Sequence, residues 1–160
     1  GSSFGITKIK EVNELVNAID KALLHDNKVL IEQFIKGTEV SCGVFFDGEQ
    51  IISLPITEIV SENEFFDYQA KYEGKSKEIT PARINSVITK KIQNTTIDIY
   101  RKMNLRGICR IDYIIMNDDP YIIEINTIPG LSEESIIPQQ LKSAKLNLGK
   151  IFEICLLNTN

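Results

Sequence analysis

Hydrophobic side chains recur along this chain at two spacings, and the spacing predicts which segments are helices and which are strands. Residues 11–25 and 85–103 carry apolar side chains three and four positions apart, as one face of an amphipathic helix requires. Shorter helices are expected at 135–142 and 147–157. The segments expected to be strands are mostly apolar, and they are 28–34, 39–46, 50–56, 57–60, 108–116 and 121–127.

Turn-forming residues separate these segments. Asp47-Gly48 predicts a hairpin turn between the strands at 39–46 and 50–56. Residues 117–120, Asn-Asp-Asp-Pro, separate the last two strands. Residues 61–81 are polar and aromatic, and a loop of that size inside a compact domain is usually functional or mobile.

The last two strands place four polar side chains on one face of a predicted hairpin. If the hairpin is centred on Asp118, Asp112 lies opposite Glu124 and Arg110 lies opposite Asn126. Side chains alternate between the two faces of a strand, so these four share a face. The opposite face is the expected core face, and it carries Cys109, Ile111, Tyr113, Ile115, Ile123 and Ile125.

Two carboxylates that face each other across a hairpin repel, because their β-carbons are only about 5 Å apart. Arg110 relieves part of this repulsion, and a divalent cation would relieve more. The donors of Asp112, Glu124 and Asn126 are all oxygen, which favours magnesium over zinc. Two ions about 3.5–4 Å apart could share Glu124 and clamp a phosphate chain. From the pattern alone, an ion-pair patch on the sheet surface is the alternative.

The stretches RGICRIDYII and PYIIEINTIPGLSEESIIP resemble the ATP-grasp signature of D-alanine–D-alanine ligases. The resemblance implies that Asp112, Glu124 and Asn126 hold two Mg²⁺ ions on ATP, with Mn²⁺ as a possible substitute. It also implies that Arg110 lines the acyl-phosphate site. The implied fold is α+β. Its carboxy-terminal ATP-grasp subdomain, a mainly antiparallel sheet flanked by helices, covers 37–160, and the tail of the central ATP-grasp subdomain covers 1–36.

Two further segments resemble nucleotide-binding parts of the same family. The sequence IEQFI followed by GTE is similar to the hinge that holds adenine and ribose, although by itself it reads only as a strand and a turn. The residues that would contact adenine and ribose are Glu32, Gln33, Phe34, Ile35 and Glu39. Residues 1–5 resemble a phosphate-covering loop in which Ser2 and Ser3 contact phosphate oxygens; a cloning scar is the alternative.

The remaining expected site residues lie in two loops. The sequence FDYQAKY resembles a lid in which Lys71 reaches ATP phosphate and Tyr72 lies near the second D-alanine. The Gly130 amide would stabilise the tetrahedral intermediate. Ser135 would bind the second substrate's carboxylate, and Ile136 would shape its pocket. Read without the resemblance, the lid is a surface loop with exposed aromatic side chains, and Ser135 is a helix cap.

Composition excludes several other classes of protein. The 160 residues carry a net charge of −4, which gives no basic face for nucleic acid, and no apolar run is long enough to cross a membrane. Three cysteines without metal-ligand spacing are expected to be buried free thiols in a reducing cytoplasm. His25 is the only histidine, which argues against a zinc site or a catalytic triad.

The resemblance implies a function for the longer protein from which this chain is cut. That protein is expected to ligate two D-alanines through an acyl phosphate, using ATP, in the cytoplasm, for peptidoglycan precursors, and as a homodimer. The chain begins at the phosphate loop, so by itself it is expected to be catalytically inactive. The alternatives are another ATP-grasp carboxylate–amine ligase and a non-catalytic nucleotide-binding module.

Overall fold

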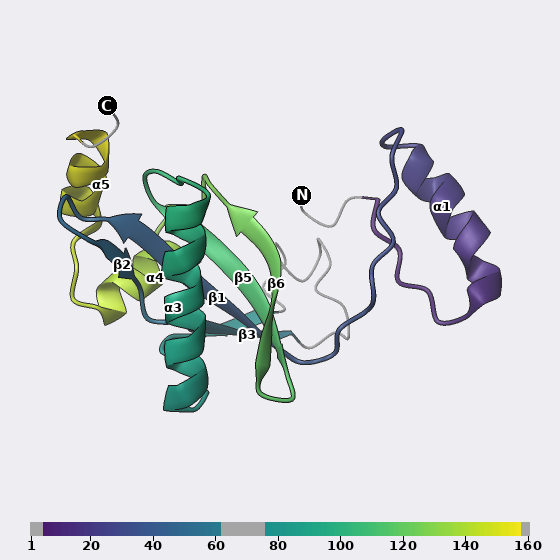
Figure 1. The fold of residues 1–160 in the computed structure, drawn as a ribbon, viewed down its shortest axis with the longest axis horizontal. Coiled ribbons are helices and arrows are strands. Elements are labelled where there is room, and N and C mark those ends of the chain that lie inside the picture. The colour runs from purple at the N-terminus through teal and green to yellow at the C-terminus, as the bar shows by residue number, and fades with distance from the viewer. Residues whose placement is uncertain (1–4, 62–75, 158–160) are drawn as a thin grey trace. The chain divides into compact units, whose positions relative to one another are not determined.

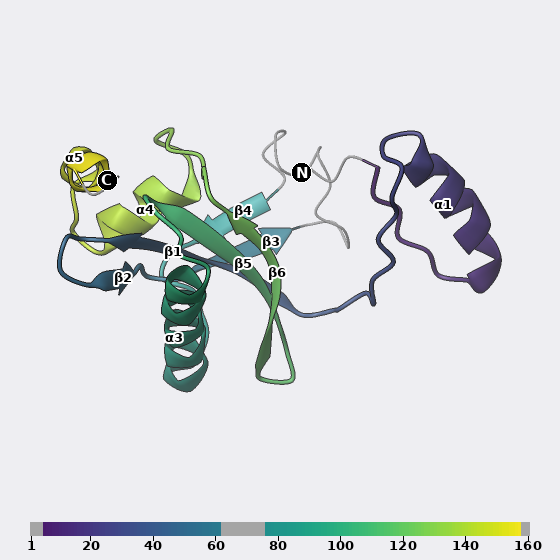
Figure 2. The same cartoon turned by 45° about the horizontal axis from the view of Figure 1, so that its top comes forward.

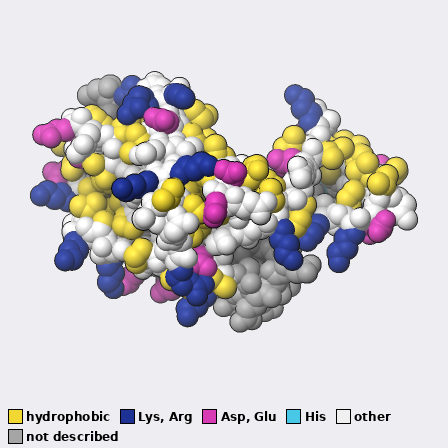
Figure 3. Space-filling model, turned by 60° about the horizontal axis from the view of Figure 1, so that its bottom comes forward, with side chains coloured by type: hydrophobic (Ala, Val, Ile, Leu, Met, Phe, Trp, Pro, Cys, Tyr) yellow, Lys and Arg dark blue, Asp and Glu magenta, His cyan; other side chains and the backbone are white. Residues whose placement is uncertain are grey.

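The computed structural model describes residues 5–61 and 76–157. The described residues form two compact units, one made of 5–35 and the other of 36–60 with 77–157, and each is described by itself. Within the described ranges, no helix is long and apolar enough to cross a membrane. On the face drawn in Figure 3, basic and acidic side chains are interspersed rather than gathered by sign.

The first unit contains the helix predicted at 11–25. A 3₁₀ turn, η1 (Val12–Glu14), leads into α1 (Leu15–Leu23). The Glu14 carboxylate accepts hydrogen bonds from the backbone N–H groups of Lys10 at 2.7 Å and Glu11 at 3.0 Å, which satisfies two donors at the helix start. No residue of α1 is fully buried: Leu15, Ala18, Ile19 and Ala22 are half-buried along one face, whereas Val16 and Leu23 are exposed.

The prediction of a strand at residues 28–34 is wrong. These residues have no regular secondary structure, and Leu30, Ile31 and Phe34 are exposed. A strand needs a neighbour to bond its N–H and C=O groups, and no described segment of this unit pairs with it. The Lys8 ammonium lies 3.7 Å from the centre of the Phe34 ring.

The second unit is built on a sheet in the order β4-β3-β1-β5-β6, with β2 also paired to β1. Its strands are β1 (Thr38–Phe46), β2 (Ile51–Ser53), β3 (Thr57–Ser61), β4 (Ser76–Ile79), β5 (Cys109–Met116) and β6 (Asp119–Asn126). The strand predicted at 50–56 is shorter than expected, because the pairing with β1 slips by one residue between Ser53 and Thr57. β4 lies within the stretch predicted to be a loop.

Three helices cover the sheet: α3 (Ser86–Lys102), α4 (Ile136–Ser143) and α5 (Leu148–Leu157), as the periodicity predicts. Figures 1 and 2 show α3 on one face of the sheet and α4 on the other. The core under α3 includes Ile92, Ile111 and Tyr113, whose hydroxyl shares a 2.7 Å hydrogen bond with Thr96. The Asn85 side chain caps α3 by accepting from Ile88 N–H at 2.9 Å.

The hairpin β5–β6 has the predicted register near the site but a different turn. Asn117 and Asp118 alone form the turn, with φ of 52° and 65°, and Met116 pairs with Asp119. A bulge at Ile123 then moves the register by one residue. The predicted core face is confirmed for Cys109, Ile111, Tyr113 and Ile115, and Ile125 packs against that core. It is wrong for the bulged Ile123, which is 51% exposed.

Candidate functional site

The hairpin β5–β6 brings together the four polar residues that the alternation predicts. Arg110 pairs with Asn126, and Asp112 pairs with Glu124, across the two strands. Arg110 and Asp112 are largely buried, with side chains 13% and 9% exposed, whereas that of Glu124 is 48% exposed. The cluster therefore has a buried end on β5 and an open end on β6.

Asp112 is held by three side chains. Arg110 Nε and Nη2 donate to its two carboxylate oxygens at 2.8 and 2.7 Å, which is a bidentate pair. The Ser41 hydroxyl donates to Asp112 Oδ1 at 2.5 Å, and Asn126 Nδ2 donates to Oδ2 at 3.0 Å. These bonds fix the carboxylate before any ligand arrives.

The charge of Arg110 is secured by its neighbours. Burial alone would lower the pKa of its guanidinium. Its hydrogen bonds to Asp112 and the nearby charges of Glu124 and Glu78 outweigh burial and raise that pKa. Arg110 Nη2 also lies 3.9 Å from Glu124 Oε1. A permanently charged, forked donor thus lies beside two carboxylates.

Two residues of this cluster escape the sequence reasoning. Ser41 lies on β1 directly opposite Asp112, and its position follows from the β1–β5 register, which joins segments about seventy residues apart. A polar residue inside the buried strand VSCGVF is a signal that could have found it. Glu78 lies on β4, in the stretch read as a loop, and accepts from Gln139 Nε2.

The predicted substrate loop is held at the start of α4. The Ser132 and Ser135 hydroxyls share a 2.7 Å hydrogen bond, and Ser135 N–H donates to the Ser132 carbonyl at 2.8 Å. A Cβ on Gly130 would lie 2.8 Å from Ser135 Oγ, so Gly130 and Ser135 are neighbours. Ile136 is buried in the first turn of α4.

The other predicted residues are spread over the two units. Glu39 pairs with Ile114 on β5, which puts it on the same sheet face as Ser41 and Asp112. The hinge residues Glu32, Gln33, Phe34 and Ile35 belong to the first unit. Ser2, Ser3, Lys71 and Tyr72 lie outside the described residues.

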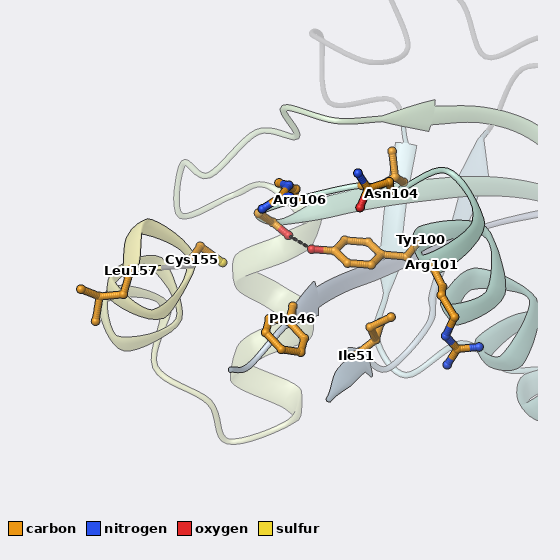
Figure 4. Close-up of a pocket in the computed structure, with 10 residues that line it drawn as sticks. Phe46, Ile51, Tyr100, Arg101, Asn104, Arg106, Cys155 and Leu157 are labelled. Atoms are coloured by element: carbon orange, nitrogen blue, oxygen red, sulfur yellow. Dashed lines mark hydrogen bonds between the residues drawn. The ribbon is translucent and has the colours of Figure 1, made fainter. Parts of the chain in front are cut away.

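A separate hollow of about 440 Å³ lies beside the end of β1, lined by parts of α3 and α5 (Figure 4). There the Tyr100 hydroxyl donates to the Gly107 carbonyl at 2.9 Å. Burial raises the pKa of Tyr100 to about 12, so its hydroxyl stays protonated well above neutral pH. None of the predicted site residues lines this hollow, so it is distinct from the β5–β6 cluster.

The donor chemistry of the cluster fits a hard divalent cation. Within the described part of the chain, no three His, Cys, Asp or Glu side chains gather as a metal site, and the Asn126 amide adds an oxygen donor beside the two carboxylates. In the structure, Asn126 Nδ2 lies between the two carboxylates, 3.0 Å from Asp112 Oδ2 and 2.9 Å from Glu124 Oε1. The partly positive NH₂ group of the Asn126 amide thus bridges the two carboxylates. Rotation of the amide would turn its oxygen toward the space between them instead.

Comparison with known proteins gives one consistent result. A family model described as "D-ala D-ala ligase C-terminus" matches residues 1–156. A D-alanine–D-alanine ligase of Flavobacterium johnsoniae is 53% identical over 152 residues, covering 95% of this chain and 47% of that protein. The chain therefore spans about half the length of the curated relatives it matches.

Solved structures share the fold. The VanG D-Ala:D-Ser ligase from Enterococcus faecalis has a TM-score of 0.82 at 34% identity, over 98% of this chain and 46% of its own. The D-alanine–D-alanine ligase from Bacillus anthracis complexed with ATP has a TM-score of 0.79 at 28% identity, over 97% of this chain and 50% of its own. These neighbours confirm the α+β fold, an antiparallel sheet with flanking helices, that the sequence predicts.

Proposed function

This chain belongs to the family of D-ala D-ala ligase carboxy-terminal domains, and from that premise we propose that it is the ATP- and metal-binding part of a ligase that joins two D-alanines. The reaction proceeds in two steps. ATP phosphorylates the carboxylate of one D-alanine, and the amine of the second attacks the acyl phosphate and releases phosphate. The product serves peptidoglycan precursor synthesis in the cytoplasm.

In this proposal Asp112, Glu124 and Asn126 are the ligands of two Mg²⁺ ions, with Mn²⁺ as a substitute. When bound, the ions neutralise the charge that develops on the transferred phosphoryl group. Arg110 presents its guanidinium to the acyl-phosphate oxygens, and its raised pKa keeps it charged at every working pH. The support is that all four side chains lie on one sheet face and are linked in a chain of hydrogen bonds, from Arg110 to Asp112, from Asn126 to Asp112 and from Asn126 to Glu124.

The loop before α4 holds the second substrate in this proposal. The Gly130 amide stabilises the tetrahedral oxyanion, because a backbone N–H fixed in place needs no reorganisation as charge develops. The Ser135 hydroxyl binds the carboxylate of the second D-alanine, and Ile136 shapes its pocket. The proximity of Gly130 to Ser135 supports a shared task.

The remaining roles follow the same proposal. Residues 1–36 belong to the central ATP-grasp subdomain and 37–160 to the carboxy-terminal one. The nucleotide is held by Glu32, Gln33, Phe34, Ile35 and Glu39, and its phosphates by Ser2, Ser3 and Lys71. Tyr72 lies near the second D-alanine, and the full-length enzyme is a homodimer that binds neither nucleic acid nor membrane.

The observation that carries the proposal is the pairing of Asp112 with Glu124 beside Asn126, within a chain that matches the family over residues 1–156. The decisive assay is phosphate release by the full-length protein with ATP, Mg²⁺ and D-alanine. Asp112→Asn or Glu124→Gln should reduce turnover at least about a hundredfold. Glu153→Gln, an exposed change of the same kind on α5, should leave it unchanged.

A substrate series gives the assay its specificity. One structural neighbour is a D-Ala:D-Ser ligase, so D-serine should be offered beside D-alanine as the second amino acid. Turnover with unrelated carboxylate–amine pairs but not with D-alanine would contradict the proposed substrate. The 160-residue chain assayed alone should give no turnover, because it spans about half the length of its relatives. Robust turnover by it would refute that part of the proposal.

A further inference from the structure

We propose that Gln140, a buried residue of α4, is a positioning residue that fixes the substrate loop relative to Asp112. The inference rests on the proposed function for what Asp112 and Ser135 do, but the connection between them is structural. It begins where the sheet is irregular, at the slip in register between β2 and β3.

The slip leaves Cys42 and Gly43 of β1 without a regular partner on the side of β2 and β3, although both pair with β5 on the other side. Leu54 N–H donates to the Gly43 carbonyl at 2.8 Å, but the Leu54 carbonyl accepts instead from Gln93 Nε2 at 3.2 Å and from Cys42 Sγ at 3.6 Å. The Gly43 N–H then donates to Gln140 Oε1 at 3.0 Å. A side chain of α4 thus takes the position that a neighbouring strand would otherwise fill.

All the bonding capacity of the Gln140 amide nitrogen is used as well. Gln140 Nε2 donates to the Ser41 carbonyl at 2.9 Å and to Thr57 Oγ1 at 3.1 Å. The Gln140, Ser41 and Thr57 side chains are fully buried. A buried amide destabilises a fold unless its bonds are made, and here the oxygen and both amide hydrogens have partners.

The strand is shaped to receive this amide. A Cβ on Gly43 would lie 2.5 Å from Gln140 Oε1 and 2.6 Å from Ile137 Cδ1, so the absence of a side chain on Gly43 lets α4 approach the backbone of β1. Glycine inside a strand weakens it and often marks the close approach of another group. At this position the approaching group is Gln140.

From Gln140 the contacts lead in two directions. Ser41, whose carbonyl accepts from Gln140, holds the Asp112 carboxylate with its hydroxyl at 2.5 Å. In the other direction, Gln140 lies in the helix that Ser135 begins, and Ser135 is bonded to Ser132. One side chain therefore links the helix that carries the substrate loop to the strand that orients a metal ligand.

The test compares two glutamines that bond to residues at the register slip, one from α3 and one from α4. Gln140→Met keeps the size and burial but removes the amide, and Gln93→Met on α3 is the matched control. Amide exchange and NMR spectra of the 160-residue chain without ligands report on both. Gln140→Met should speed exchange of the Gly43 N–H about tenfold and shift the Asp112 carboxyl and Ser135 amide resonances. Gln93→Met should do neither.

Two results would overturn the inference. One is faster exchange at Gly43 with unchanged Asp112 and Ser135 resonances, because Gln140 would then only satisfy a backbone group. The other result concerns a second variant, which is needed if Gln140→Met does not fold. Thr57→Val then removes one of the three Gln140 bonds, together with the 2.6 Å bond between the Thr57 and Thr80 hydroxyls, at nearly constant volume, and it should shift the Asp112 and Ser135 resonances by less. No shift in that variant would contradict positioning.

A kinetic measurement on the full-length protein separates this inference from the proposed function. Gln140→Met should raise KM for the second amino acid about tenfold while KM for ATP stays within about twofold. An equal rise in both would contradict a role in positioning the substrate loop. If the unmodified full-length protein does not ligate D-alanine, the proposed function fails, whereas the spectra still decide whether Gln140 couples the two sites.

Discussion

Asp112 and Glu124 lie directly opposite each other across β5 and β6, although the turn between the strands would by itself pair Asp112 with Ile123. The two-residue turn sets one register at its own end, from Met116 and Asp119 onward. The extra residue Ile123 moves the register by one before the acidic pair is reached. The bulge therefore decides that both carboxylates share a face, and bulges often re-aim side chains in this way next to active sites.

The turn itself can be tested through Asp118, which has a φ of 65°. Asp tolerates this left-handed conformation better than most residues, and Gly adopts it without strain. Asp118→Ala should lower the free energy of unfolding by about 1 kcal/mol, whereas Asp118→Gly should not lower it. Urea unfolding of both variants checks this. Equal losses would mean that the turn conformation is not what matters.

The two carboxylates should contribute to stability to different degrees when no metal is present. Asp112→Asn leaves the buried Arg110 guanidinium without its bidentate partner, and it should lower the free energy of unfolding by about 1–3 kcal/mol. Glu124→Gln removes a half-exposed charge that repels Asp112, and it should change stability by less than about 0.5 kcal/mol. Urea unfolding in EDTA measures both. A larger loss for Glu124→Gln would contradict this division.

The close approach of α4 to β1 makes Gly43 sensitive to the smallest substitution. A Cβ there would overlap Gln140 Oε1 and Ile137 Cδ1, both held in the core, so Gly43→Ala should cost about 1–3 kcal/mol. Gly149→Ala is the control, because a Cβ on Gly149 would meet only the side chain of Asn147, the residue before α5, at 3.2 Å. That variant should be neutral or slightly stabilising, as Ala favours helix over Gly. Thermal unfolding of both variants decides.

An ion pair between Glu58 on β3 and Arg83 should make the free energy of unfolding depend on pH in the acid range. Arg83 donates to both Glu58 carboxylate oxygens, at 2.9 and 2.7 Å, and these bonds hold the pKa of Glu58 below its ordinary value. The pair therefore stabilises the fold fully above about pH 4.3, the ordinary glutamate value. This stabilisation disappears as the pH falls through the lower folded pKa.

Glu58→Gln should remove this part of the acid dependence. The effect should be modest and weaker in salt, because the Arg83 side chain is 62% exposed. Unfolding midpoints between pH 3 and 6 should converge for wild type and variant at the acid end. Glu49→Gln, an exposed change in the β1–β2 turn, should follow the wild-type curve throughout. Parallel curves for wild type and Glu58→Gln would contradict the assignment.

The three thiols should differ in reactivity. Burial raises the pKa of Cys42 to about 12 and of Cys109 to about 11, so both remain protonated at pH 8, and only thiolates react readily. Cys155 is half-buried, and burial raises its pKa as well. Iodoacetamide at pH 8 should modify Cys155 first, and the other two only in urea, as peptide mass spectrometry would show. Early labelling of Cys42 would contradict its burial.

The sequence by itself determined which faces of the main elements are apolar. The spacing in residues 85–103 and the alternation in 108–116 are local, and each defines a buried face whatever lies beside it. The same alternation put Arg110 and Asp112 on one polar face. These predictions were confirmed because side-chain direction follows from the backbone period alone.

The tertiary structure decided what depends on partners distant in the sequence. The segment 28–34 has strand-like composition but no strand to bond with among the described residues, and β4 forms because β3 offers an edge. The bulge at Ile123, the Ser41 bond to Asp112 and the Gln140 amide in the gap beside Gly43 all arise from pairing between separate elements. Such pairing depends on register and on close approach of distant elements, which no local pattern encodes.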